Sequence, residues 1–345
     1  MNFIPAVVVM AVISAGVHSL ATAGELPLQI IATRPQSRID AVAYLGEGVV
    51  LAGTRSMPGS GHILRSKDFG ESWQTIGNIT GNEEITCLCS GGDGIGYLLT
   101  GKNVHVWKTS DYGETWEDLG KVSNAVNGYY ANAYGMTTTR TGTLLVSDAD
   151  KPGGRVHRST DQGKTWKHIG PLSDQALYRL NVVGDGIIVN GWAGHVYKST
   201  DDGATWNDQG KISDSALYAI EYLSQGIVLI GDESGRIFRS TDNGRTWTAQ
   251  GIPGTAADDF AWLGGERVLF TTYTGNREIH LSKDAGLTWK SLGGVGLERG
   301  KDWLDHVISI QDKDVRTVVG GTNQGFIVFA RLPSATAPRA VRPRE

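Results

Sequence analysis

The chain has 345 residues, of which 40% are hydrophobic and 20% are charged, and its formal net charge at pH 7 is −4. This apolar content is enough for a packed core, which excludes wholesale disorder, and the balanced charge gives no sign of a nucleic-acid partner. Glycine is abundant, at 47 residues, but it does not recur at every third position, so a collagen-like fold is also excluded.

The N-terminal segment has the pattern of an export signal. Residues 4–17 form an apolar stretch that is too short to span a bilayer comfortably, and residues 21–23 (Ala-Thr-Ala) supply a small-residue cleavage pattern. We expect residues 1–23 to be removed and the mature chain, from Gly24, to be secreted or periplasmic without a membrane span. An uncleaved anchor is the alternative, because no Lys or Arg precedes the apolar stretch.

The two cysteines give no sign of redox or metal chemistry. Cys87 and Cys89 lie two residues apart in a stretch that reads as a strand, so their side chains point to the same face. A disulfide across one residue is strained, and we expect two small buried apolar side chains instead. We predict no cofactor and no metal.

One octapeptide recurs six times between residues 66 and 289, beginning with SKDFGESW at residues 66–73. Its aspartates are Asp68, Asp111, Asp161, Asp201, Asp242 and Asp284. Successive copies are 40 to 50 residues apart, and a period near 40 with strand-like content predicts propeller blades of about four strands each.

The unit between residues 216 and 248 indicates where the octapeptide lies in a blade. Residues 216–223, 226–231 and 235–240 read as three strands, and residues 246–248 open a fourth. The octapeptide is therefore the turn from the third strand to the fourth. Its aspartate can accept hydrogen bonds from the turn, its glycine suits a positive φ, and its tryptophan offers a large packing surface.

The octapeptide resembles the Asp-box, or bacterial neuraminidase repeat, whose pattern is Ser/Thr-x-Asp-x-Gly-x-Thr/Ser-Trp. This resemblance to the sialidase-like family implies a β-propeller in which the boxes lie on the face away from the active site. We therefore interpret the six box aspartates as structural rather than catalytic.

A seventh unit follows without a box. Residues 305–310, 316–320 and 325–332 resemble the first three strands of a blade, and residues 26–32 form an unassigned strand that could pair into it. Such a pairing would close the ring and remove an open sheet edge. We predict one all-β domain over residues 24–333, a seven-bladed propeller of four-stranded blades. Six blades, as in sialidases, is the alternative, and residues 334–345 are expected to be a disordered tail.

The first strands of the units should begin at a common mouth. They start near Asp40, Thr86, Tyr130, Tyr178, Tyr218, Asp258 and His306. The loops between the second and third strands add Arg55, Asp148, Asp150, Trp192, Asp232, Glu233, Tyr273 and Arg277. Concave mouths with aromatic faces suit ligands such as sugar rings. The predicted ligand-binding residues are Arg38, Asp40, Arg55, Tyr130, Tyr178, Trp192, Tyr218, Asp258 and His306. A plain polar rim is the alternative interpretation.

The resemblance to sialidases extends to Arg38, which stands where that family has one of three arginines for a substrate carboxylate, and to Arg55, which resembles the next arginine of that family. The rest of the expected constellation is missing. Residues 56–61 contain no carboxylate for the acid, and residues 305–306 (Asp-His) replace a Tyr-Ser pair. Sialoside hydrolysis is therefore not predicted. Asp40 and Asp258, at equivalent strand starts, remain candidates for the carboxylate pair of another glycoside hydrolase.

The sequence thus favours an exported, non-catalytic binding or scaffold module, monomeric, for a carbohydrate or an extracytoplasmic protein. Regular Asp-box propellers also resemble photosystem assembly factors and other extracytoplasmic scaffolds. The alternative is a glycoside hydrolase with a divergent active site.

Overall fold

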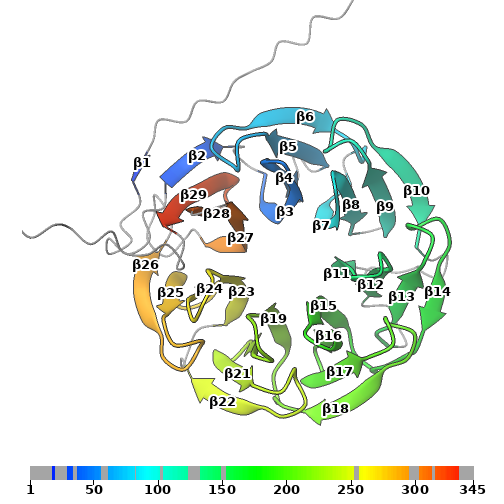
Figure 1. Ribbon diagram of the computed structural model, residues 1–345, viewed down its shortest axis with the longest axis vertical. Coiled ribbons are helices and arrows are strands. Elements are labelled where there is room, and N and C mark those ends of the chain that lie inside the picture. Colours follow the sequence, from blue (N-terminus) through cyan, green and yellow to red (C-terminus); the bar gives the residue numbers. More distant parts are fainter. Residues whose placement is uncertain are drawn as a thin grey trace, which may run out of the picture.

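The computed structural model describes residues 18–19, 29–33, 37–55, 61–81, 83–101, 104–122, 133–148, 153–251, 256–294, 303–312 and 315–333. These residues form strands and turns that are grouped into seven antiparallel sheets around a ring (Figure 1). The predicted all-β propeller with seven four-stranded blades is confirmed, which excludes the six-bladed alternative. No helix in this part of the chain is long and apolar enough to cross a membrane.

The first four blades follow one another along the chain, and in each blade the strands run in chain order from the innermost strand outward. Blade 1 contains β3 (Ile39–Gly46), β4 (Val49–Thr54), β5 (His62–Ser66) and β6 (Gln74–Asn78). Blade 2 contains β7 (Ile85–Gly92), β8 (Ile95–Thr100), β9 (His105–Thr109) and β10 (Glu117–Lys121). Blade 3 contains β11 (Ala133–Thr138), β12 (Leu144–Asp148), β13 (Val156–Ser159) and β14 (Lys167–Ile169). Blade 4 contains β15 (Leu177–Val183), β16 (Gly186–Gly191), β17 (His195–Ser199) and β18 (Asn207–Lys211).

Blades 5 and 6 repeat the same order, whereas blade 7 combines both ends of the domain. Blade 5 contains β19 (Leu217–Tyr222), β20 (Val228–Asp232), β21 (Arg236–Ser240) and β22 (Thr248–Gly251). Blade 6 contains β23 (Ala257–Trp262), β24 (Val268–Thr272), β25 (Glu278–Ser282) and β26 (Lys290–Gly294). Blade 7 contains β27 (Leu304–Asp312), β28 (Val315–Thr322) and β29 (Phe326–Pro333), with β2 (Gln29–Thr33) as its fourth strand and β1 (His18–Ser19) beside β2.

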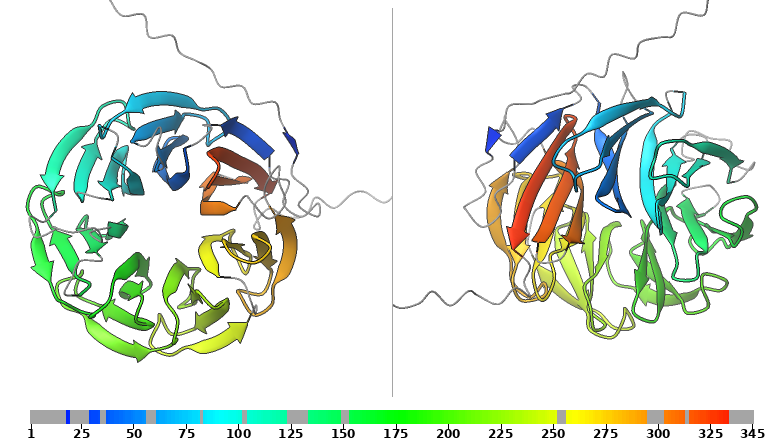
Figure 2. Two further views of the ribbon diagram at one scale, coloured as in Figure 1. Left: turned by 180° about the vertical axis from the view of Figure 1, so that it is seen from behind. Right: turned by 45° about the horizontal axis from the view of Figure 1, so that its top comes forward.

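The N-terminal strand β2 pairs antiparallel with β29 from the other end of the chain. Their register matches Gln29 with Phe329 and Thr33 with Phe326, and Figure 2 shows β2, in blue, beside β29, in red. That β2 is needed to hold the ring closed stays a prediction. The expected tail, residues 334–345, and most of the expected signal peptide lie outside the described residues.

The hydrophobic core is divided among the blade interfaces. Each of the seven clusters of buried side chains combines residues from two neighbouring blades. Between blades 1 and 2, for example, Leu51 and Ile63 pack with Ile85 and Leu98, all at most 1% exposed. Because the burial of apolar area drives folding, the blades stabilise one another.

The octapeptide turns have the hydrogen bonds that their residue types predict. In the first, the Ser66 hydroxyl donates to Asp68 Oδ1 over 2.7 Å and accepts the Gly70 N–H over 2.8 Å, while Asp68 Oδ1 accepts the Ser72 N–H over 2.9 Å. The same three bonds recur in the other five turns. Gly70 has the expected positive φ, 99°, and so does Phe69 before it, at 61°.

The innermost strand of every blade begins with a β-bulge. In blade 1, Ile39 pairs with Thr54 and Ala41 with Gly53, so Asp40 lies between two ladder positions without a partner of its own. The bulged residues of the seven blades are Asp40, Thr86, Tyr134, Tyr178 with Arg179, Tyr218, Asp258 and Asp305. A bulge re-aims a side chain out of the regular ladder, and these seven bulges lie at the same end of the ring, which we call the mouth.

Candidate functional site

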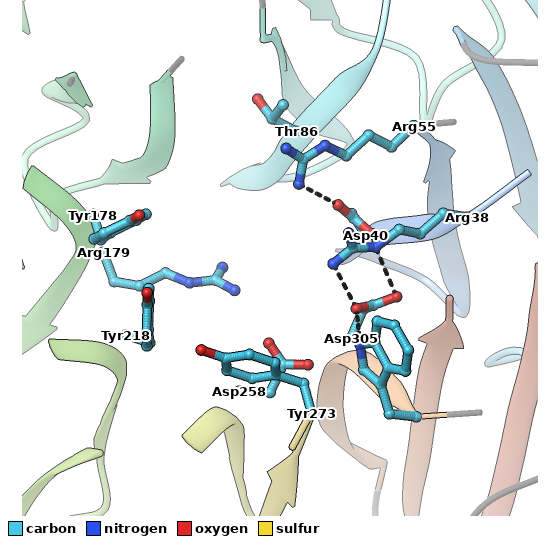
Figure 3. A pocket seen from close by; sticks show the side chains of 11 residues that line it. Arg38, Asp40, Arg55, Thr86, Tyr178, Arg179, Tyr218, Asp258, Tyr273 and Asp305 are labelled. Carbon is cyan, nitrogen blue, oxygen red and sulfur yellow. Dashed lines mark hydrogen bonds and ion pairs between the residues drawn. The ribbon is translucent and has the colours of Figure 1, made fainter. Parts of the chain in front are cut away.

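A cavity of about 320 Å³ lies at the mouth. Its lining comprises Arg38, Asp40, Arg55, Thr86, Tyr178, Arg179, Tyr218, Asp258, Tyr273, Trp303 and Asp305 (Figure 3). Seven of these are bulged residues, so the repeated distortion of the inner strands builds the cavity. The turns that hold the octapeptides join the far ends of the third strands and therefore face the other way.

The structure brings six of the nine predicted ligand-binding residues together in this cavity. They are Arg38, Asp40, Arg55, Tyr178, Tyr218 and Asp258. Trp192 lies at its rim, 48% exposed, with its ring centroid 6.0 Å from that of Tyr178. Tyr130 lies outside the described residues, and the equivalent backbone position in blade 3 belongs to Tyr134.

His306 is a predicted residue that lies outside the cavity lining. Its Nδ1 lies 3.0 Å from Asp259 Oδ2. The bulge in β27 falls between Leu304 and His306, so the preceding residue, Asp305, takes the mouth position. The sequence carried a signal for this, because Leu304 matches Ile39 and Leu217 as the buried apolar residue that immediately precedes each mouth residue.

Sequence reasoning also missed Arg179 and Trp303. Arg179 reaches the mouth because the bulge in β15 sets two residues, Tyr178 and Arg179, against the single residue Asn190. The Arg179 N–H donates to Asn190 Oδ1 over 3.0 Å, which fixes this distortion. Among the described innermost strands, only β15 has two bulged residues in a row, and neither residue type nor the repeat period predicts it.

Two of the three arginines at the mouth are held by carboxylates. The Arg38 guanidinium donates to both oxygens of Asp305, over 3.0 and 2.7 Å, and its Nε lies 2.5 Å from Asp40 Oδ1. Arg55 Nη1 donates to the other Asp40 oxygen over 2.6 Å (Figure 3). These paired contacts hold the side chains of β3 and β27 in place on one side of the cavity.

Asp305 titrates near neutrality in this network. Burial raises its pKa to about 7, and the nearby charge of Asp40 adds to the effect, although Arg38 and Trp303 oppose it. The Trp303 indole N–H donates to Asp305 Oδ1 over 2.6 Å. The net charge of the mouth therefore becomes more positive as the pH falls through about 7.

Asp258 is a second carboxyl group with a raised pKa. Its burial, together with the charges of Asp305 and Asp259, raises the pKa well above the usual range of an aspartate, although Arg38 and Arg179 oppose this. Its Oδ2 atom is buried and has no hydrogen-bond partner in the described part of the chain. Asp258 therefore keeps its proton to higher pH than an exposed aspartate does.

Arg179 is the third arginine, and its guanidinium points into the cavity (Figure 3). Burial lowers its pKa, but the surrounding carboxylates, of which Asp259 acts most strongly, more than offset this and leave the pKa raised. Among the described residues, no hydrogen bond or ion pair engages this guanidinium. The mouth thus contains a permanent cation that no described side chain neutralises by contact.

Four aromatic rings form a continuous row from the rim into the cavity, which we call the aromatic track. It runs from Trp192 through Tyr178 and Tyr218 to Tyr273, with successive ring centroids 6.0, 5.1 and 5.8 Å apart. Burial raises the pKa of Tyr273, so this phenol stays protonated. The track offers a ligand apolar faces with hydroxyl groups at their edges.

Neither a metal site nor a reactive thiol appears in the described part of the chain. No group of three or more His, Cys, Asp or Glu side chains there is arranged to hold a metal ion. Cys87 and Cys89 are both unpaired thiols, and burial raises the pKa of each. A raised pKa disfavours the thiolate, which is the reactive form.

Comparison with family models finds the BNR/Asp-box repeat at residues 157–168 and 238–249. These ranges contain the whole of the third octapeptide, residues 159–166, and of the fifth, residues 240–247. No curated protein matches the sequence.

Among solved structures, the chain is similar to YCF48 bound to a D1 peptide, with a TM-score of 0.70, 13% identity, and coverage of 94% of this chain and 100% of the other. It is also similar to YCF48 from Cyanidioschyzon merolae, with a TM-score of 0.66, 12% identity and coverage of 88% and 98%. A catalytically inactive virginiamycin B lyase from Staphylococcus aureus, solved with quinupristin, gives a TM-score of 0.73, 15% identity and coverage of 89% and 100%.

These likenesses establish the class of the protein at the level of its fold. The chain is a seven-bladed β-propeller that carries BNR/Asp-box repeats. Because one of the similar proteins was solved with a peptide and another is an enzyme, and because propellers host many functions, its function has to be argued from the mouth.

Proposed function

We propose that the protein is a non-catalytic binding module that takes a segment of another protein at its mouth. The observation that carries this proposal is the aromatic track, which leads from the exposed ring of Trp192 into a cavity that contains arginines. Tryptophan, tyrosine and arginine are the residue types that most often dominate the binding energy of protein interfaces.

The dimensions of the site favour an extended ligand. A cavity of about 320 Å³ is near the lower limit for small-molecule pockets, and it suits one or two side chains or a chain end. The aromatic track continues this surface outward across blades 4, 5 and 6. The likeness to YCF48 bound to a D1 peptide supports the same choice, since that propeller is similar over 94% of this chain.

We also propose that the module acts outside the cytoplasm as a monomer. The support is the apolar stretch at residues 4–17 followed by small residues before Gly24. N-terminal sequencing of the protein recovered from the medium or periplasm of a bacterial host would be expected to begin at Gly24, and a chain that starts at Met1 and stays in the cell would contradict export.

Peptide display tests the binding function against the carbohydrate alternative. Residues 24–345 are used to select from a random peptide library and are applied in parallel to a glycan array. We expect selected peptides to bind, and Trp192→Ala and Tyr218→Ala each to weaken binding at least about tenfold. Trp262→Ala is the control. It removes an aromatic ring at the end of β23 that lies away from the mouth, and it should leave binding unchanged. If glycans but no peptides bound through the same residues, the ligand would be a carbohydrate rather than a protein. If no ligand depended on the residues of the mouth, the proposal would be overturned.

A glycoside hydrolase is the second candidate, and Asp258 is the observation that favours it. A carboxyl group that keeps its proton can act as a general acid, and Asp40 lines the same cavity as a possible second carboxylate. Turnover of a panel of aryl glycosides, including a sialoside, that is lost in Asp40→Asn or Asp258→Asn would establish this function. No turnover across the panel would remove it.

A further inference from the structure

The three arginines at the mouth are not equivalent. Arg38 and Arg55 already donate to Asp305 and Asp40 over 2.6 to 3.0 Å, so their guanidinium groups are partly neutralised. Arg179 lies across the cavity from them, and no hydrogen bond or ion pair within the described residues engages its guanidinium (Figure 3). A charged group in such a position favours an anionic partner from outside the chain.

Asp258 provides a second, independent observation that points to a ligand. It lines the same cavity, its Oδ2 atom is buried, and this oxygen has no hydrogen-bond partner among the described residues. A buried polar atom without a partner costs free energy that a ligand can recover. In its acid form Asp258 is an O–H donor, and it therefore complements an acceptor rather than a cation.

We propose that the mouth binds the carboxylate of a protein segment, either its C-terminus or an acidic side chain, between the Arg179 guanidinium and the acid form of Asp258. This inference rests on the proposed function and names the group that the site recognises. The guanidinium supplies a charge-assisted hydrogen bond, and the Asp258 hydroxyl supplies a second donor. The chain next to the carboxylate then lies along the aromatic track, beginning at Tyr218.

The proposal makes binding depend on pH with a definite sign. Asp258 donates only while it holds its proton, so binding is strong below its raised pKa and weakens as the pH rises through it. The groups that face Asp258 are Asp305 of β27, Asp259 of β23, Arg38, Arg179 of β15, and Tyr273. Asp305 loses its proton near pH 7 and weakens anion binding in the same direction, whereas the arginines keep their charge.

Probes of defined charge test the carboxylate directly. Binding of acetyl-tyrosyl-alanyl-alanine to residues 24–345 is compared by isothermal titration with binding of its C-terminal amide and of acetyl-tyrosyl-aspartyl-alanine amide. We expect one of the two carboxylate probes to bind at least about tenfold more tightly than the uncharged amide. Which of the two binds tells whether the site takes a chain end or an acidic side chain. Glucuronate, a carboxylate without a peptide, is expected to bind more weakly than that probe.

Variants of the two donors complete the test. Arg179→Met should weaken the carboxylate probe at least about tenfold, and Arg179→Gln repeats the measurement if the first variant does not fold. Arg245→Met, at an exposed arginine in the fifth octapeptide turn, is the matched control and should bind as the wild type does. Asp258→Asn keeps an N–H donor but cannot ionise, so its binding of the carboxylate probe should persist to higher pH than that of the wild type.

The outcomes separate this inference from the function beneath it. Asp305 titrates in both proteins, so a difference in pH profile between wild type and Asp258→Asn reports Asp258 together with its coupling to Asp305. The carboxylate site would be overturned if the acid and amide probes bound equally. It would also be overturned if Arg179→Met and Arg179→Gln bound the acid probe like the wild type. If Tyr218→Ala still weakened those probes, the mouth would remain a peptide site of another chemistry. Loss of the Tyr218 effect as well would remove the proposed function.

Discussion

One aspartate in each octapeptide turn accepts the hydrogen bonds that hold the turn together, so protonation of these aspartates in acid should lower the stability of the protein. The Thr165 side chain and N–H lower the pKa of Asp161 to about 2. In Asp201 and Asp242 burial opposes the shift, yet hydrogen bonds still lower the pKa to about 2. Since the ionised form accepts these bonds, their contribution is complete above about pH 4, the pKa of an unfolded aspartate, and is lost as the pH falls through about 2.

We therefore expect the urea midpoint of residues 24–345 to fall steeply between about pH 4 and pH 2. Asp161→Asn should be less stable than the wild type at pH 6, and the difference should narrow toward pH 2, where the wild-type carboxylate is protonated. Chemical denaturation followed by tryptophan fluorescence measures both. A constant difference between the two proteins from pH 6 to pH 2 would contradict this role of the aspartate.

Substitution of two glycines in blade 4 distinguishes the cost of backbone strain from the cost of a close contact. Gly194 has φ of +76°, and a Cβ there would lie 1.8 Å from the Ser213 carbonyl oxygen. Gly210 has a similar φ, +97°, but a Cβ there would meet nothing within 4 Å. Alanine at Gly210 pays only the strain of a left-handed residue, about 1–2 kcal/mol.

We expect Gly194→Ala to cost about 3 kcal/mol or more, because the backbone must also move away from the new methyl group. Gly210→Ala is the matched control. The free energies of unfolding from urea titrations give the comparison. Equal losses in the two variants would mean that the close approach of Gly194 to Ser213 does not contribute.

At the scale of the strand, the regular repeats predicted the fold, whereas the irregular bulges, which place part of the site, were not predicted. Six octapeptides with a period near 40 residues predicted the blades, because turn chemistry tied to residue type recurs wherever the turn does. The apolar residue before each bulge, such as Ile39 or Leu217, is fully buried and marks where an inner strand begins. The expected starts of the first strands predicted Asp40, Tyr178, Tyr218 and Asp258 at a common mouth, and the structure has all four in the lining of the cavity.

The prediction of His306 in place of Asp305 is wrong by one residue, which in a strand moves a side chain to the other face, although the apolar Leu304 marked the correct position. The other missed features depend on backbone detail that has no sequence signature. Arg179 depends on the double bulge opposite Asn190. The pairing of Arg38 with Asp305 joins residues 267 positions apart, and no local pattern could predict it.

Strand β2 gives the prediction that belongs to this scale. It pairs with β29 at four positions, from Gln29 with Phe329 to Thr33 with Phe326. Without β2, the backbone of β29 becomes an open edge next to blade 1, and open edges promote association. We expect residues 34–345 to be less stable than residues 24–345 by roughly 3–4 kcal/mol, at about 1 kcal/mol for each lost hydrogen bond.

Thermal unfolding and size-exclusion chromatography of the two truncated chains test whether β2 closes the ring. The shorter chain should melt at a lower temperature and elute partly as aggregates. Two chains with the same melting temperature, both monomeric, would show that blade 7 holds together with β27, β28 and β29 alone.

At the scale of the whole molecule, the two faces of the propeller have different tasks. The octapeptide turns form one face, where each aspartate is saturated by hydrogen bonds of its own turn. The mouth lies at the other end of the inner strands and has a cavity lined by Arg179 and Asp258. Buried polar atoms without a partner occur in the turns as well, among them the indole nitrogens of Trp116, Trp247 and Trp289. The cavity and its charged groups are therefore the reason for the proposal that recognition takes place at the mouth.

The tryptophans of the protein are distributed so that one measurement can compare the two faces. Trp192 and Trp303 lie at the mouth, and the octapeptide turns carry Trp73, Trp116, Trp166, Trp206, Trp247 and Trp289. Their indole N–H resonances in a two-dimensional nitrogen–proton NMR spectrum can be assigned by single Trp→Phe variants. The spectrum of residues 24–345 would be recorded while acetyl-tyrosyl-alanyl-alanine is added. We predict that the resonances of Trp192 and Trp303 shift progressively and saturate while those of the six turn tryptophans stay in place, whereas shifts confined to the turn tryptophans would contradict binding at the mouth.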